Sequence, residues 1–146
     1  QVIVLDEPTS SLTVQEVDKL FEMMRLLKEQ GIEDYRVIWT VTGEENEGMK
    51  KLKAEAEENK LPIEFIGPVP RTQLFEQYAS SVLVFPSYIE TIGLPLLEAR
   101  SVGAPILAAD CLYARDGVGG YDRAEFFETF DSEALSRLMK QKIVEK

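Results

Sequence analysis

The stretch that decides the fold is residues 81–109, SVLVFPSYIETIGLPLLEARSVGAPILAA. It predicts one apolar strand at Ser81–Phe85, ended by a proline, and a second at Pro105–Ala109. Between them lies a predicted helix at Pro95–Val102, with proline in its first turn and Gly103 at its end. Two apolar strands joined through a helix are typical of a parallel βαβ unit.

The same alternation of strand and helix runs through the rest of the chain. Further strands are expected at Gln1–Leu5, Tyr35–Val41 and Ile63–Ile66, with a short one at Glu125–Phe127. Further helices are expected from the Thr13/Glu16 capping box to Gly31, at residues 44–59, at Thr72–Ala79 and from about Asp131, with a glycine-rich loop at Asp116–Gly120. The pattern predicts residues 1–146 to be a single α/β domain: one Rossmann-like, doubly wound parallel sheet of five or six strands with helices on both faces.

Composition excludes several classes of function. The chain has 146 residues, 45% of them hydrophobic, which is enough for one core. Its net charge of −10 disfavours binding to nucleic acid, and no apolar run is long enough to span a membrane. Histidine is absent and Cys111 is the single cysteine, so no metal site and no cofactor are expected. A cytoplasmic location is the expectation, and the sequence leaves the oligomeric state open.

Ligands of doubly wound sheets bind beyond the carboxyl ends of the strands. The loops that follow the predicted strands are Asp6–Leu12, Thr42–Glu45, Gly67–Arg71, Pro86–Leu94 and Asp110–Gly120. Any site is expected among these loops. Trp39 is expected in the core, with base stacking as its alternative, and Cys111 is expected to be an inert thiol.

The first loop carries a specific string, because residues 4–12 read VLDEPTSSL. Over residues 1–31 the chain resembles the Walker B and D-loop segment of sugar-importer ABC ATPases. In that family the position of Asp6 helps to hold Mg²⁺ and that of Glu7 activates water. The chain has no phosphate-binding G-x-x-x-x-G-K-[ST] loop, so both acids are expected to be relicts without a nucleotide. The alternative is a strand–turn–helix unit that only folds.

From residue 32 to 141 the chain resembles the C-terminal, donor-binding domain of GT-B glycosyltransferases of family 4. The string IEFIGPVPRTQLFEQYASSVLVFPSYIETIGLPLLEARSVGAPILAAD carries the resemblance, with the acid pair Glu90 and Glu98. The resemblance implies that a nucleotide-diphosphate sugar is the partner. Binding is expected to be weak.

The same resemblance implies the site residues. Glu90 lies near the donor sugar and is the family-implied catalytic position, although no active catalytic residue is expected here. Glu98 binds the ribose hydroxyls, and Gly67 and Val69 pack against the base. The helix start at Thr91, Ile92, Gly93 and Leu94 receives the diphosphate, because free helix N–H groups suit an anion. Alternatives remain: a dipole-compensating acid for Glu98, an exposed loop acid for Glu90 and a turn glycine for Gly93.

The first loop departs from the glycosyltransferase pattern. The family has an arginine and a lysine there, which neutralise the diphosphate. This chain has Asp6 and Glu7, and the first basic residue after them is Lys19. Two acids in place of two cations predict affinity lower by roughly three orders of magnitude or more.

These two resemblances predict a chimera: an ATPase-like strand and helix at residues 1–31 grafted onto a glycosyltransferase-like segment at 32–146. We therefore expect an engineered or chimeric domain, derived mainly from the nucleotide-sugar-binding half of a retaining glycosyltransferase and inactive on its own. The alternative is a natural donor-binding domain that transfers the sugar together with an acceptor domain. Two further hypotheses remain open: a folding scaffold that binds no ligand, and an ATPase.

Overall fold

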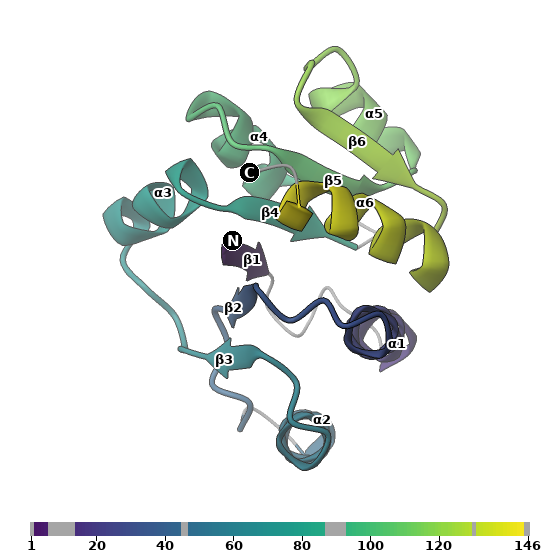
Figure 1. The fold of residues 1–146 in the computed structure, drawn as a ribbon. Helices are drawn as coiled ribbons and strands as arrows, with labels where there is room; N and C mark the ends of the chain where they lie inside the picture. The colour runs from purple at the N-terminus through teal and green to yellow at the C-terminus, as the bar shows by residue number, and fades with distance from the viewer. Residues whose placement is uncertain (1, 6–13, 45–46, 87–92, 130, 145–146) are drawn as a thin grey trace.

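A computed structural model describes the backbone of residues 2–5, 14–44, 47–86, 93–129 and 131–144, and side chains from Asp18 onward within these ranges. The strands are β1 (Val2–Leu5), β2 (Arg36–Trp39), β3 (Ile63–Phe65), β4 (Val82–Phe85), β5 (Ile106–Ala109) and β6 (Ala124–Phe127). The helices are α1 (Val14–Glu29), α2 (Glu47–Glu58), α3 (Arg71–Ala79), α4 (Leu94–Ser101), α5 (Leu112–Val118) and α6 (Ser132–Val144). Strand and helix alternate from β1 to α6, as the sequence predicts (Figure 1).

The six strands form one parallel sheet in the order β3-β2-β1-β4-β5-β6. The chain builds outward from β1 to β3, then crosses back to β4 and builds outward in the other direction. This is the strand order of a doubly wound Rossmann fold, so the predicted fold class is confirmed.

Each face of the sheet has its own hydrophobic core. Helices α1, α2 and α6 cover one face, and α3, α4 and α5 cover the other (Figure 1). Alternate residues of β4 point to opposite faces: Val82 and Val84 join the first core, and Leu83 and Phe85 join the second. Because both faces are covered, these strands are apolar throughout instead of alternating with polar residues.

Helix α1 packs against α6 on the first face. Its apolar stripe, spaced three and four residues apart, is buried at Leu20, Phe21, Met24 and Leu27. Gly31 adopts φ +76° directly after the helix, where its amide donates to the Lys28 carbonyl oxygen at 3.0 Å. This is the left-handed helix end that the sequence predicts.

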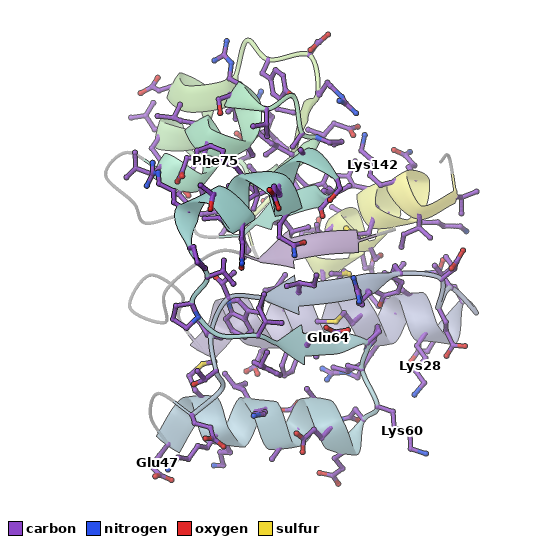
Figure 2. The ribbon with its side chains drawn as sticks, turned by 90° about the vertical axis from the view of Figure 1, so that its left-hand side faces the viewer. Lys28, Glu47, Lys60, Glu64, Phe75 and Lys142 are labelled. Atoms are coloured by element: carbon purple, nitrogen blue, oxygen red, sulfur yellow. The ribbon has the colours of Figure 1, made fainter. Side chains whose placement is uncertain are left out.

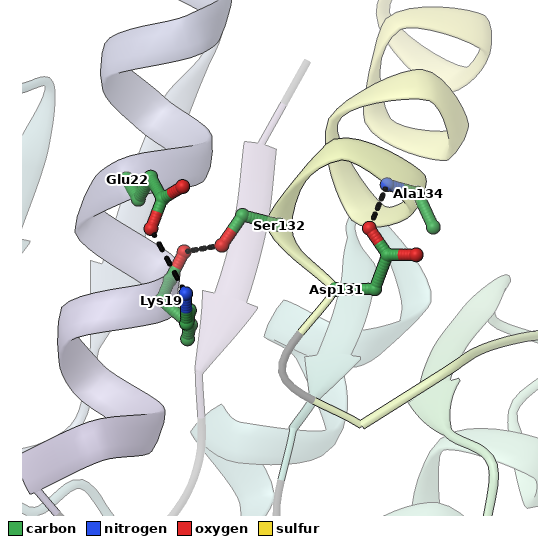
Figure 3. Close-up of polar contacts among 5 residues, drawn as sticks. All are labelled: Lys19, Glu22, Asp131, Ser132 and Ala134. Atoms are coloured by element: carbon green, nitrogen blue, oxygen red, sulfur yellow. Dashed lines mark hydrogen bonds and ion pairs between the residues drawn. The ribbon is translucent and has the colours of Figure 1, made fainter.

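A polar contact fixes the two helices together. The Ser132 hydroxyl, at the start of α6, donates to the Lys19 carbonyl oxygen of α1 at 3.0 Å (Figure 3). The Asp131 side chain accepts a hydrogen bond from the Ala134 amide at 2.9 Å and thereby caps α6. The predicted start of this helix near Asp131 is confirmed.

The predicted loop at Asp116–Gly120 is wrong in its first half, because α5 extends over Leu112–Val118. Glycine within the segment suggested a loop, yet Ala114 and Val118 are buried against α4 and supply the apolar contact that makes the helix form. The other elements start or end within a few residues of their predicted bounds. Within the described ranges, no helix is both long enough and apolar enough to cross a membrane.

Trp39 tests the core of the first face. Its side chain is fully buried, 5.6 Å from the Phe65 ring between centroids. We expect Trp39→Ala to lower the free energy of unfolding by about 3–5 kcal/mol, because the cavity cannot collapse fully. Leu112→Ala, at a side chain 80% exposed, is the control and should change it by less than about 0.5 kcal/mol. The measurement is urea unfolding followed by circular dichroism. If both variants lost the same free energy of unfolding, the burial of Trp39 would be contradicted.

Tyr35 should make the fold sensitive to alkali. Burial, with a smaller effect of the Glu33 charge, raises the pKa of Tyr35 from 10.0 to about 12. Between these values the unfolded chain loses the phenol proton while the folded chain keeps it, so stability falls as pH rises from 10 to 12. The loss should be about 2–3 kcal/mol for this residue.

The measurement is urea unfolding at pH 9, 10, 11 and 11.5 for the parent chain and for Tyr35→Phe. The variant keeps the ring and lacks the ionisable group, so its stability should fall less steeply above pH 10. Parallel pH curves for the two chains would show that Tyr35 titrates normally.

Candidate functional site

The topology places a ligand site at the carboxyl ends of β1 and β4. The strand order reverses between these two neighbours. In open α/β sheets the binding crevice lies outside the carboxyl ends at such a point. Figure 2 shows this edge on its left-hand side, toward which the strand arrowheads point. The segments that follow β1, β3, β4 and β5 at this edge are therefore the candidates for the site.

Some of the predicted site residues fall outside the described residues. These are Asp6 and Glu7 after β1, and Glu90, Thr91 and Ile92 after β4. Their roles stay predictions. The described part of the edge contains Gly67, Val69, Gly93, Leu94 and Glu98.

Gly93 is the residue before α4 and has φ +70°, ψ +54°. A Cβ at this position would lie 2.8 Å from Cε2 of Tyr113, so a larger residue would displace the tyrosine ring. That ring packs edge-on against Phe85 at 6.2 Å between centroids. Glycine is thus required both for the left-handed turn, which agrees with the alternative of a turn glycine, and for close contact with an aromatic ring.

The start of α4 is suited to an anion. Since Gly93 has no side chain, it cannot cap the first amides of the helix, and the Leu96 amide bonds the Gly93 carbonyl oxygen at 3.0 Å. Pro95 occupies the first turn, as predicted. Leu94 is 54% exposed and lies at the edge that the topology assigns to the ligand.

Glu98 lies in the second turn of α4, so the alternative of a first-turn acid is wrong. Only 11% of its side chain is exposed, and its Oε2 lies 3.2 Å from Nη2 of Arg71, the first residue of α3. Helical side chains lean toward the N-terminus of their helix, so this carboxylate leans toward the carboxyl edge of the sheet. The structure therefore holds a sheltered carboxylate beside the start of α4.

The segment before Arg71 contains the two residues expected near a base. Gly67 follows β3 with φ +77°, and its amide donates to the Val41 carbonyl oxygen at 3.1 Å. Val69 is half-buried, two residues before Arg71. Through the Arg71–Glu98 ion pair, the structure brings this segment next to α4.

The sequence analysis did not single out the ion pair at the end of β5. Arg115 Nε and Nη2 donate to the two Asp110 oxygens at 2.8 and 2.9 Å. These bonds lower the pKa of Asp110. The guanidinium lies 3.9 Å above the Phe126 ring centroid. Arg115, the basic residue nearest to Cys111 in sequence, is thus engaged with a carboxylate, and the inert thiol stays a prediction.

Lys19, the first basic residue after β1, lies on α1 beside a small pocket. Its Nζ lies 3.3 Å from Glu22 Oε2 (Figure 3). The pocket is lined by Lys19, Leu20, Pro86, Phe127, Asp131, Ser132 and Leu135. In the part of the chain with described side chains, no group of three or more cysteine or acidic residues could hold a metal ion.

Comparison with known sequences finds one family along most of the chain. The family described as "Glycosyl transferases group 1" matches residues 11–145. A D-inositol 3-phosphate glycosyltransferase from Streptomyces avermitilis is 44% identical over 107 residues, which cover 64% of this chain and 23% of that protein. A sulfoquinovosyl transferase from Arabidopsis thaliana is 33% identical over 94 residues, which cover 64% of this chain and 17% of that protein. The chain therefore corresponds to about a fifth of the length of these relatives.

Solved structures share the fold over the whole chain. A sucrose-phosphate synthase from Thermosynechococcus elongatus superposes with a TM-score of 0.75 over 97% of this chain and 36% of its own, at 20% identity. A trehalose-6-phosphate synthase superposes with a TM-score of 0.74 over all of this chain and 38% of its own, at 12% identity.

These matches correct the expected chimera. The family match begins at residue 11, well before the junction expected at Gly31, and so includes all of α1. The comparisons give no support for an ATPase component or for an engineered origin. An apolar strand followed by an amphipathic helix is a unit that unrelated parallel sheets share.

The sequence family and the strand order point to the same architecture. The doubly wound sheet with its switch point at β1 and β4 is the architecture of the GT-B neighbours. From residue 11 to 145, the chain belongs to group 1 of the glycosyl transferases.

Proposed function

We propose that this chain is the nucleotide-sugar-binding half of a retaining GT-B glycosyltransferase, and that it transfers sugar only together with an acceptor-binding domain. The observation that carries the proposal is Glu98: a carboxylate with 11% exposure, next to the start of α4, at the edge where the strand order reverses. This acid is ion-paired with Arg71 and lies at the edge where doubly wound folds bind ligands, which supports a role in binding.

Each described residue has one task in this proposal. The Glu98 carboxylate accepts hydrogen bonds from the two vicinal ribose hydroxyls. The Leu94 amide, which follows Gly93, and the positive end of the α4 dipole face the diphosphate. The segment with Gly67 and Val69 borders the base. Glu90, outside the described residues, is the acid proposed to lie near the donor sugar.

The chemistry that such a site supports is release of a diphosphate. When the bond between the sugar and the terminal phosphate breaks, negative charge grows on the leaving nucleoside diphosphate. The positive end of the α4 dipole, together with the Leu94 amide, stabilises that charge. The acceptor hydroxyl forms the new bond to the sugar, and its proton passes to the leaving diphosphate. This chain supplies the donor side of the reaction, and we expect no transfer from the chain alone.

Glu98→Gln tests the ribose contact. Glutamine keeps the size of the side chain and removes its charge, so affinity for a nucleoside diphosphate should fall about tenfold or more through loss of charge-assisted hydrogen bonds. The measurement is an NMR titration with uridine, guanosine and adenosine diphosphates that follows the amide signals of Gly93 and Leu94. The parent chain should respond to at least one of the three at millimolar concentration.

Glu64→Gln is the matched control. Glu64 also forms an ion pair with an arginine, Arg36 at 3.4 Å, but on β3 with half of its side chain exposed. The Glu64→Gln variant should bind nucleoside diphosphates as tightly as the parent chain. A parent chain whose spectrum does not respond to any of the three diphosphates would refute the proposal.

A domain of the same ancestry without nucleotide-sugar affinity is the second candidate. The sequence favours it at one place, because Asp6 and Glu7 occupy positions where the family has cations. The net charge of −10 also opposes an approaching diphosphate.

Asp6→Arg combined with Glu7→Lys should therefore raise affinity for a nucleoside diphosphate by about a hundredfold or more, since each of the two charge-assisted contacts contributes about 1.5–3 kcal/mol. The control carries two charge reversals on exposed residues of α2, Glu47→Lys and Glu57→Lys, and should raise affinity only slightly. Calorimetric titration of both variants decides the matter. Equal gains would mean that only the overall charge matters.

A further inference from the structure

Arg71 is an exposed arginine with two ordered contacts at the start of α3. Its Nη2 lies 3.2 Å from Oε2 of Glu98, and its Cζ lies 5.6 Å from the ring centroid of Phe75, one turn along the same helix. Proline precedes it, with φ −58°. The guanidinium is therefore placed by a stiff backbone, an aromatic ring and a carboxylate.

We propose that Arg71 is a positioning residue for ribose recognition: it fixes the Glu98 carboxylate in the orientation in which that group accepts the two ribose hydroxyls. This inference rests on the nucleotide-binding function proposed above, and it assigns a task to a residue outside the acid pair and the helix start.

The asymmetry of the ion pair carries the inference. The Glu98 side chain is 11% exposed, whereas that of Arg71 is 69% exposed. A solvated arginine gains little from a surface ion pair and does not need this partner. A sheltered carboxylate does need a nearby positive charge, because burial without one is costly. The ion pair therefore stabilises the Glu98 carboxylate more than the Arg71 guanidinium.

None of the other ion pairs between helices and strands of the described chain holds a sheltered acid. Arg36–Glu64 and Arg25–Glu55 lie at 3.4 and 3.5 Å, with 41–53% of each side chain exposed. In Lys142–Glu125, at 2.7 Å, the lysine side chain is 25% exposed and that of the acid 39%. Such pairs contribute little to stability and mark no site. Arg71–Glu98 combines a sheltered acid with a position at the start of α3, beside the segment that contains Val69.

Geometry explains why orientation matters for this acid. Recognition of two vicinal hydroxyls requires that the plane of the carboxylate faces both of them. The Arg71–Glu98 contact is an ion pair to one buried carboxylate oxygen, Oε2, and its attraction keeps that oxygen turned toward α3. Without Arg71, Glu98 would remain in α4 but would adopt several orientations. Discrimination between ribose and deoxyribose should then fall more than overall affinity.

The experiment measures the preference for uridine diphosphate over 2′-deoxyuridine diphosphate by NMR or calorimetry. The parent chain should prefer the ribonucleotide by about fivefold or more. Arg71→Ala should reduce this ratio to about one to two, and Arg71→Lys should restore part of it. Arg36→Ala, which removes the matched exposed ion pair, should leave the ratio at its parent value.

A double-mutant cycle separates positioning from a general effect on the fold. With Glu98→Gln already present, Arg71→Ala should cause no further loss of discrimination. Arg71→Gln, which keeps a long polar side chain, serves as a second variant if circular dichroism shows that the alanine variant is unfolded.

A parent-like ratio in folded Arg71→Ala or Arg71→Gln would overturn the positioning role while nucleotide binding stands. Equal weakening of both nucleotides would overturn it as well, because it would indicate a structural tie between α3 and α4. A parent chain that binds neither nucleotide would overturn this inference and the proposed function together.

Discussion

The parallel sheet cannot expose either face to water, and the rest of the structure follows from this constraint. Its central strands β1, β4 and β5 are apolar on both sides, so helices must cover each face: α1, α2 and α6 on one, and α3, α4 and α5 on the other. Two separate cores result. The helices leave the ends of the strands uncovered, and at the carboxyl end the connecting segments meet. The place of the site is thus a consequence of how the faces are buried.

The two cores also fix the site residues individually. Glu98 is sheltered because α4 must bury Leu96 and Ala99 against the sheet. Position 93 is restricted to glycine because a Cβ there would collide with the ring of Tyr113. Packing and the proposed ligand recognition therefore act on the same short segment, from Gly93 to the second turn of α4. Substitutions there will affect stability and binding at once.

The fold could be predicted from the sequence because its signals are local. Apolar strands, the stripe of α1, the glycine at its end and the proline at the start of α4 each depend on neighbours in the chain. Helix α5 was missed because glycine lowers helix propensity, and only its contact with α4 compensates. The Arg71–Glu98 pair could not be predicted, since nothing near either residue indicates the other. A local signal also misled: VLDEPTSSL resembles an ATPase, although the family match covers α1.

The contact between the first and last helices has a consequence for folding during synthesis. Ser132 donates to Lys19 across 113 residues, and α6 closes the face on which α1 lies. That face stays open until almost the whole segment has left the ribosome, whereas the α3–α5 face is built from residues close in sequence. A nascent chain of this domain would thus expose the apolar stripe of α1 for most of its synthesis, a stage at which chaperones protect such surfaces.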